Sequence, residues 1–149
     1  MEYNNKTEEL LCEMYRNVKM GSDSLCDVTS KINDRFMLKN VTGQIGGYAE
    51  LQSKCKALMD EHHVKPKKES ALKRAMAKGG IVLNTVFDSS DEHIAEMIVK
   101  GTEMGADSLE KTMNTCKKYG VSENIVELCE NVIKFERGAS GVMKDYTVK

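Results

Sequence analysis

The sequence predicts an all-α fold: an antiparallel four-helix bundle built from two duplicated helical hairpins, with a shorter crossover helix between them. Three observations support this prediction. The 149-residue chain has one proline and no tryptophan, and charged residues make up 30% of it, a composition that is typical of helical proteins. Apolar residues recur at helical spacing, and one hexapeptide occurs twice.

The repeated hexapeptide sets the register of the two halves. Residues 20–25 (MGSDSL) recur as residues 104–109 (MGADSL), identical at five of six positions and 84 residues later. The same offset, without a gap, aligns apolar residues with apolar residues further along the chain, for example Met59 with Met143. A match that extends over many helical turns indicates a duplicated hairpin.

The first hairpin is predicted for residues 7–62. An apolar stripe predicts a first helix that ends at about Ile32, and the second helix covers roughly residues 35–62. The break between them is short, which favours an antiparallel pair. A glycine inside a helix costs up to about 1 kcal/mol, so we expect Gly21, which lies on the stripe, to permit close approach of a neighbouring helix. The pair Gly46-Gly47 predicts either a bend or tight packing.

The crossover is predicted for residues 63–88 and the second hairpin for residues 89–146. Pro66 and the lysines around it indicate a linker, followed by an interrupted helix over about residues 69–87. A capping segment then starts a third long helix that runs to about Tyr119. Ser122 is expected to help cap the last helix, which runs from about Glu123 to Tyr146.

Charge and hydropathy exclude several function classes. The net charge of −1 provides no field that attracts nucleic acid. No run of about 18 apolar residues exists to span a membrane, and the first five residues are polar and acidic, unlike a basic leader followed by an apolar stretch. We therefore expect a cytoplasmic protein with neither nucleic-acid nor membrane partners.

The cysteines give no sign of redox or metal chemistry. All five are spaced without a Cys-x-x-Cys pair, and several fall on apolar helix faces. We expect them to be reduced and to act as small core residues. Cys55 is the nearest candidate nucleophile, but no histidine is predicted on its helix face to activate it.

Two short segments resemble a known family. Residues 100–103 (KGTE) and residues 48–51 (YAEL) are similar to segments in a bacterial family of ferritin-like four-helix-bundle proteins of unassigned function. This resemblance implies the ferritin-like arrangement of two hairpins joined by a long connection. Ferritin-like metalloproteins hold two metal ions with one Glu from each of two helices and a Glu-x-x-His pair from each of the others.

The ligand positions of such a di-metal site can be tested in this register. At mid-length, the second and fourth long helices carry Gln52-x-x-Cys55 and Glu136-x-x-Ala139 on their apolar stripes, and neither is Glu-x-x-His. The facing positions, about Val18 and Thr102, are not carboxylates. Only Glu136 qualifies as a ligand, so the sequence predicts that the di-iron site has been lost. Glu136 is then either a residual ligand or a buried acid paired with Gln52 or a lysine.

Two weaker metal-site candidates remain. Asp60 and His63 have the i, i+3 spacing of a mononuclear site, to which Asp145 or Glu123 would add a ligand. A solvated helix end is the simpler interpretation of this cluster. An atypical iron or manganese site would use Glu136 with Glu50 or Glu103.

These observations predict a non-enzymatic ferritin-like bundle that acts as a structural or protein-interaction module without cofactors. It is expected to form a homo-oligomer through a helical face, and the small-residue surface of Gly101 and Gly105 is the candidate face. Asp23 and Asp107 are predicted on the outer side. The alternative function is a metal-binding protein, either an iron or manganese store or an oxidoreductase. Binding of a small molecule in the bundle core is a third possible function.

Overall fold

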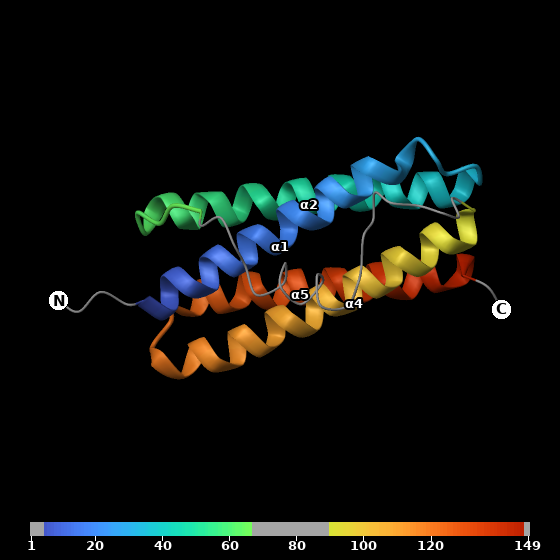
Figure 1. The fold of residues 1–149 in the computed structure, drawn as a ribbon. Coiled ribbons are helices and arrows are strands. Elements are labelled where there is room, and N and C mark those ends of the chain that lie inside the picture. The colour runs from blue at the N-terminus through green and yellow to red at the C-terminus, as the bar shows by residue number, and fades with distance from the viewer. Residues whose placement is uncertain (1–4, 67–89, 148–149) are drawn as a thin grey trace.

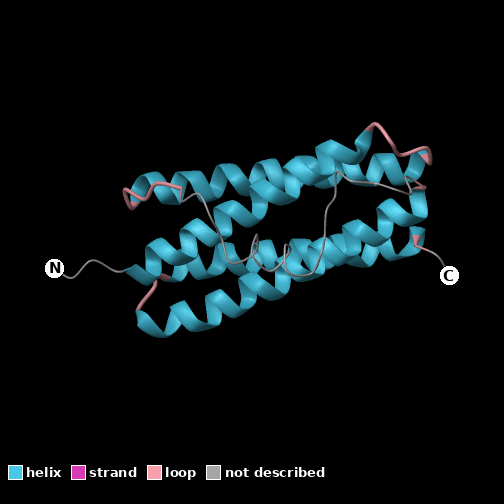
Figure 2. Ribbon diagram, viewed as in Figure 1, coloured by secondary structure: helices cyan, strands magenta, loops and turns pink. Residues whose placement is uncertain are grey.

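The computed structural model describes residues 5–66 and 90–147, which form four long helices (Figures 1 and 2). The all-α prediction is confirmed, because the described residues include helices, turns and loops but no strand. The helix predicted for residues 69–87 lies outside the described part. The elements are α1 (Asn5–Thr29), α2 (Arg35–Glu61), α4 (Asp91–Cys116), the 3₁₀ turn η1 (Lys117–Tyr119), α5 (Glu123–Met143) and the 3₁₀ turn η2 (Lys144–Tyr146).

The helices are arranged as two pairs. In Figure 1 the chain runs along α1 and returns along α2, then runs along α4 and returns along α5. Helix α1 packs mainly on α2 and α4 mainly on α5, and α1 also packs on α4 along the middle of the bundle. Contact between α2 and α5 is much sparser. The bundle is therefore tight on its α1–α4 side and more open on its α2–α5 side.

Side-chain caps and one loop contact define the ends of the helices. The carboxylate of Asp34 accepts a hydrogen bond from Met37 N at 2.8 Å, which satisfies one of the unpaired donors in the first turn of α2. The carboxylate of Asp91, in the first turn of α4, accepts from Asn33 N at 2.9 Å and from Asp34 N at 2.7 Å. This acid therefore ties the loop of the first pair to the start of the second pair.

The apolar stripes predicted from the sequence form the core. Every residue predicted on the stripe of α5 is buried, and several pairs of residues related by the 84-residue offset are both buried. Leu25 and Leu109 are 3% and 2% exposed, and Met59 and Met143 are fully buried. This agreement is what a duplicated hairpin predicts, and common descent of the two hairpins stays a prediction.

Two glycines permit close packing between helices. A Cβ built on Gly21 would stand 2.7 Å from Cε1 of Tyr48, and one on Gly47 would stand 2.6 Å from Cζ of Phe135. Tyr48 and Phe135 meet edge to face, with ring centroids 4.9 Å apart, which is a favourable geometry for an aromatic pair. The close approach expected at Gly21 is confirmed, and Gly47 shows the tight packing that was one of two expectations.

Three predicted helix ends differ from the structure. Helix α1 ends at Thr29 instead of about Ile32, because Lys31 N and Ile32 N bond to carbonyls three residues back, in a turn. The last turns of the second pair of helices, η1 and η2, are 3₁₀ in form, which is common at helix ends. Ser122 precedes α5 as expected, but its side chain makes no capping hydrogen bond.

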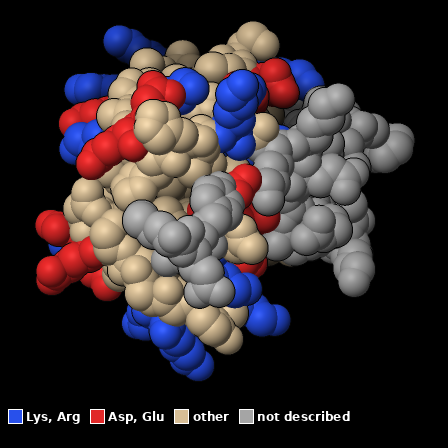
Figure 3. All heavy atoms as spheres, turned by 90° about the vertical axis from the view of Figure 1, so that its left-hand side faces the viewer, with Lys and Arg blue, Asp and Glu red and all other residues tan. Residues whose placement is uncertain are grey.

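The surface carries charges of both signs. The end of the bundle that faces the viewer in Figure 3 shows acidic and basic side chains on the same face. Asp23 pairs with Lys19 at 2.8 Å and Asp107 pairs with Arg137 at 3.1 Å, and all four side chains are well exposed. The prediction that both aspartates lie on the outer side is confirmed. No helix within residues 5–66 or 90–147 is long and apolar enough to cross a membrane.

Candidate functional site: a buried carboxylate beside a cavity

Glu136 lies in the middle of the bundle, where its carboxylate is enclosed by three other helices. The residue is 2% exposed. The hydroxyl of Tyr48, from α2, donates a hydrogen bond to Glu136 Oε2 at 2.8 Å. On the side of α4, Gly105 leaves room for the acid, since a Cβ there would stand 2.8 Å from the same oxygen. A glycine and a phenol thus accommodate the one carboxylate that the sequence predicted on the core stripe.

The partner of Glu136 corrects the prediction made from the sequence. Among the described residues, neither Gln52 nor a lysine pairs with this acid. The amide of Gln52 is half-buried and donates a long, 3.5 Å hydrogen bond to the hydroxyl of Tyr15. Tyr48, one helical turn before Gln52, takes the place facing Glu136 because the two pairs of helices dock with that offset.

Burial keeps Glu136 largely protonated near neutral pH. Loss of solvent raises the pKa of its carboxyl group from the ordinary 4.5 to about 8, although hydrogen bonding from Tyr48 and Asn17 and the charge of Arg137 offset part of the rise. The same surroundings raise the pKa of the Tyr48 hydroxyl well above its ordinary value, mainly through burial. At pH 7 the pair is therefore an acid and a phenol, both mostly neutral.

Asn17 completes the polar centre, and sequence reasoning missed it. This α1 side chain is 2% exposed, and its Nδ2 donates to the carbonyl oxygen of Gly105 at 2.9 Å. No group of the described residues donates a well-formed hydrogen bond to Asn17 Oδ1 or Glu136 Oε1. The available signal was weak, since a polar residue next to Val18 on a helix normally indicates the edge of the core.

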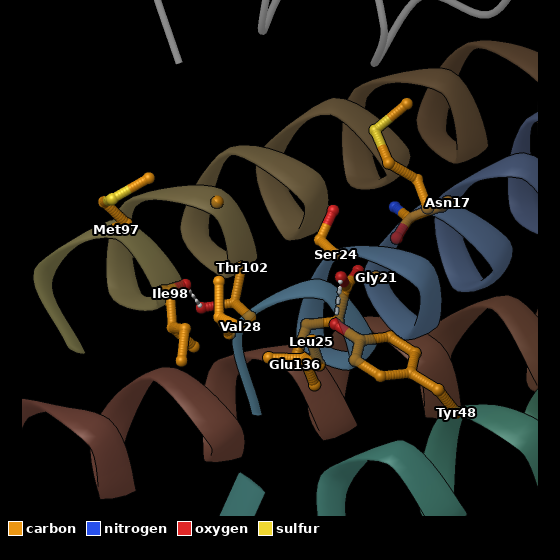
Figure 4. A pocket seen from close by; sticks show the side chains of 12 residues that line it. Asn17, Gly21, Ser24, Leu25, Val28, Tyr48, Met97, Ile98, Thr102 and Glu136 are labelled. Carbon is orange, nitrogen blue, oxygen red and sulfur yellow. Dashed lines mark hydrogen bonds between the residues drawn. The ribbon is translucent and has the colours of Figure 1, made fainter. Parts of the chain in front are cut away.

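A cavity of about 40 Å³ lies beside this centre, between α1 and α4 (Figure 4). Figure 4 shows the Tyr48 hydroxyl directed at the carboxylate of Glu136. The lining is mostly apolar, with the polar side chains Asn17, Ser24, Tyr48, Thr102 and Glu136 among it. The lining residues are Asn17, Met20, Gly21, Ser24, Leu25, Val28, Tyr48, Met97, Ile98, Gly101, Thr102 and Glu136.

The other carboxylates proposed as metal ligands have separate partners. Glu50 is exposed and lies 3.6 Å from Lys54 Nζ. Glu103 is half-buried, bonds to Lys144 at 2.9 Å and accepts from the hydroxyl of Ser140 at 3.0 Å. These contacts, led by the hydrogen bond from Lys144, lower the pKa of Glu103. The structure does not bring Glu50 or Glu103 to the carboxylate of Glu136.

The predicted Asp60 and His63 cluster lies at the exposed end of α2. The carboxylate of Asp60 pairs with Lys56 Nζ at 3.2 Å. His63 has a left-handed backbone, with φ of 56°, and its N–H donates to the Asp60 carbonyl at 3.2 Å. Glu123 and Asp145 are exposed. Within the described ranges, no three Asp, Glu, His or Cys side chains gather as a metal site requires.

The cysteine side chains, all within described helices, form no disulfide. Four are buried, and Cys26 is exposed. Burial raises the pKa of the Cys55 thiol to about 12 and that of Cys116 to about 11, so both are protonated at neutral pH. A protonated thiol is a poor nucleophile, which agrees with a structural role for Cys55.

A second concave surface lies between α2 and α5, where these helices pack sparsely. We call it the α2/α5 groove; it is shallow and open to solvent, with about 730 Å³ of accessible space above its lining residues. Gly43 and Gly138 are open there, since a Cβ on either would meet nothing within 4 Å. The lining residues are Lys39, Asn40, Gly43, Gln44, Asn131, Lys134, Phe135, Gly138, Ala139 and Val142.

The described fold and site define a class: an all-helical bundle with a single buried carboxylate at its centre and an open groove on one side. Comparisons of the chain with protein-family models, with curated proteins and with solved structures find no match. The functional argument therefore depends on the geometry of the chain itself.

Proposed function

We propose that this chain is a non-enzymatic, ferritin-like antiparallel bundle that serves as a protein-interaction module and self-associates through the α2/α5 groove. The two helix pairs and the long segment between them match the ferritin-like plan. The observation that carries the proposal is the groove itself. It exposes glycines on both walls and gives access to the apolar side chains Phe135, Ala139 and Val142 of α5.

Several features of the groove suit a second copy of the chain. Val142 is 43% exposed at its edge, and Gln44, 8% exposed, has an Oε1 with no donor among the described residues. Lys134 lines the groove, while Glu130 is exposed one turn earlier on the same helix. Each copy therefore carries a positive and a negative side chain at this surface. In a two-fold interface, Lys134 of one copy can pair with Glu130 of the other.

The interior position of Gly105 argues against the Gly101 and Gly105 surface that the sequence predicted as the interface. Gly105 is buried against the carboxylate of Glu136 and the amide of Asn17. It cannot contact another subunit without opening the bundle. Its packing role inside the bundle accounts for the glycine, and the α2/α5 groove becomes the candidate surface.

The mass of the protein in solution tests this proposal. The wild type is expected at twice the 16.7 kDa chain mass in multi-angle light scattering. Gly138→Arg should give single chains, because the new side chain fills the groove and adds a cation beside Lys134. Gly46→Arg is the matched control, since Gly46 is an open, exposed glycine of α2 outside the groove lining. A monomeric wild type, or a Gly138→Arg protein that keeps the dimer mass, would overturn the proposal.

A separate measurement addresses the metal-binding alternative. We infer that Glu136 is a core acid that does not ligate metal, because its known neighbours are a phenol, an amide and a glycine. Protein purified from medium supplemented with iron or manganese should contain far less than one metal ion per chain by elemental mass spectrometry. Stoichiometric metal that is lost in Glu136→Gln would contradict this inference.

A further inference from the structure

When Glu136 is ionised, the buried polar side chains that line the cavity between α1 and α4 present acceptors but few free donors. In that state the donor groups of these side chains belong to Asn17, Tyr48 and Thr102, and each of the three already donates at least one hydrogen bond. Asn17 Nδ2 donates to Gly105 O, the Tyr48 hydroxyl donates to Glu136 Oε2, and the Thr102 hydroxyl donates to the carbonyl of Ile98 at 2.8 Å. Within the described ranges, Asn17 Oδ1 and the ionised Glu136 Oε1 have no such donor. A buried acceptor without a donor is costly, so the cavity beside the ionised acid favours a ligand that donates hydrogen bonds.

The two acceptors lie close enough for one ligand to reach both. A Cβ built on Gly105 would stand 3.3 Å from Glu136 Oε1 and 3.4 Å from Asn17 Oδ1. Both oxygens therefore approach the same small region beside α4. Both side chains are 98% buried and line the cavity. One donor group with two or more N–H or O–H bonds can bridge these oxygens.

Charge and size narrow the class of ligand. Among the described residues that line the cavity there is no Lys, Arg or His, so a cation bound there would supply the counter-charge of an ionised Glu136. The rest of the lining, which includes Met20, Met97 and Ile98, suits a short hydrocarbon. A volume of about 40 Å³ holds about three water molecules, at roughly one per 10–15 Å³ of this measure, and so about three heavy atoms.

We propose that this cavity binds a small primary ammonium cation, whose N–H groups bridge Glu136 Oε1 and Asn17 Oδ1 while its carbon atoms contact the methionine and isoleucine lining. An ammonium group supplies the two donors that these oxygens require, whereas a neutral alcohol supplies one. The site is distinct from the α2/α5 groove, so its occupancy does not depend on self-association.

Binding should release the proton of Glu136. The groups that face this acid are Asn17 from α1, Tyr48 from α2, and Gly105 and Thr102 from α4. Only Tyr48 among them titrates, and its pKa is raised. Arg137, the next residue, is charged throughout the usable range. Ammonium affinity should therefore rise from pH 6 to pH 9 as Glu136 ionises, because the pKa of that carboxyl is raised to about 8.

A titration with two matched small molecules tests the proposal. Ethylammonium and ethanol have the same number of heavy atoms but differ in charge and in the number of donors. Each is added to the full-length protein at pH 9, and backbone amide shifts are followed by two-dimensional NMR. We expect saturable shifts around Asn17, Thr102 and Glu136 with ethylammonium, and at least about tenfold weaker binding of ethanol, the loss expected for one charged hydrogen bond.

Two variants remove the site in different ways. Glu136→Gln keeps the shape and removes the charge, and Gly101→Leu fills the cavity but leaves the acid in place, since a Cβ on Gly101 meets nothing within 4 Å. Both should lose about tenfold or more in ethylammonium affinity, whereas Gly46→Leu, an open glycine outside the cavity, should bind like the wild type. Three results would overturn the proposal: no saturable shift in the wild type, equal binding of ethanol, or unchanged affinity in Gly101→Leu.

Discussion

Gly21 and Gly105 occupy corresponding positions of the repeated hexapeptide, yet they accommodate different side chains. Gly21, on α1, leaves room for the aromatic ring of Tyr48. Gly105, on α4, leaves room for the carboxylate of Glu136. The two large side chains then meet, since the hydroxyl of Tyr48 donates to Glu136. Each half therefore has a recess at its glycine, but an aromatic ring fills the first recess and a carboxylate fills the second.

This difference shows how a bundle of two similar hairpins acquires one asymmetric polar centre. The repeat partners of Tyr48 and Glu136 are Val132 and Gln52. Val132 is fully buried and Gln52 is half-buried, so neither reproduces the phenol–acid pair. One half contributes the phenol, the other contributes the acid, and the two glycines let both reach the centre.

The largest expected effect comes from removing the ring that Gly21 accommodates. Tyr48→Ala should lower the free energy of unfolding by about 3–5 kcal/mol, the range for losing a large buried aromatic side chain. Tyr48→Phe keeps the ring and should lower it by about 1–2 kcal/mol, because only the hydrogen bond to Glu136 is lost. Urea denaturation measures both. Equal losses in the two variants would show that the hydroxyl, and not the ring, dominates the stability of the centre.

The acid beside Gly105 should make stability depend on pH. Because the pKa of Glu136 is raised from 4.5 to about 8 in the folded state, the folded protein keeps a proton that the unfolded chain has released between these values. Stability should therefore fall as pH rises from about 4.5 to about 8, and the loss is complete above 8. Relative to Glu136→Gln, we expect the wild type to lose about 2–4 kcal/mol over this window.

Denaturation midpoints of both proteins at pH 5, 7 and 9 check this prediction. The comparison with Glu136→Gln subtracts the contributions of the other titrating groups, such as the surface carboxylates. A difference in stability that stays constant across the window would mean that the folded state does not hold the Glu136 proton, and would remove the physical basis for a neutral acid at the centre.

Helical periodicity predicted which residues of this centre face the core, but it did not predict which residues contact one another. It placed Glu136 on the core stripe of α5 and Gly21 at a close approach, because both follow from spacing within one helix. It named Gln52 or a lysine as the partner of a paired Glu136, whereas Tyr48 is the partner. The docking of one hairpin on the other decides which turn of α2 faces α5, and periodicity within a helix contains no such information. Asn17 was missed for the same reason, since its role depends on the carbonyl of Gly105 in another helix.

The smallest effects on stability are expected from replacing each of the two glycines with alanine. Gly21→Ala should lower the free energy of unfolding by about 1–3 kcal/mol, because the new Cβ would overlap the fully buried ring of Tyr48, a rigid group that can move only as a whole and whose hydroxyl is bonded to Glu136. Gly105→Ala should cost less, about 1 kcal/mol or below, because the obstacle is the end of the Glu136 side chain beside a cavity, and the gain in helix propensity offsets part of the strain.

Gly46→Ala calibrates this pair of substitutions. A Cβ on Gly46 meets nothing within 4 Å, so this variant should gain about 0.5–1 kcal/mol from helix propensity alone. Subtracting that gain from the other two measurements isolates the cost of crowding at each recess. If Gly105→Ala then costs as much as Gly21→Ala, the carboxylate of Glu136 is held as rigidly as the ring of Tyr48, and the two recesses differ in chemistry but not in tolerance to an added methyl group.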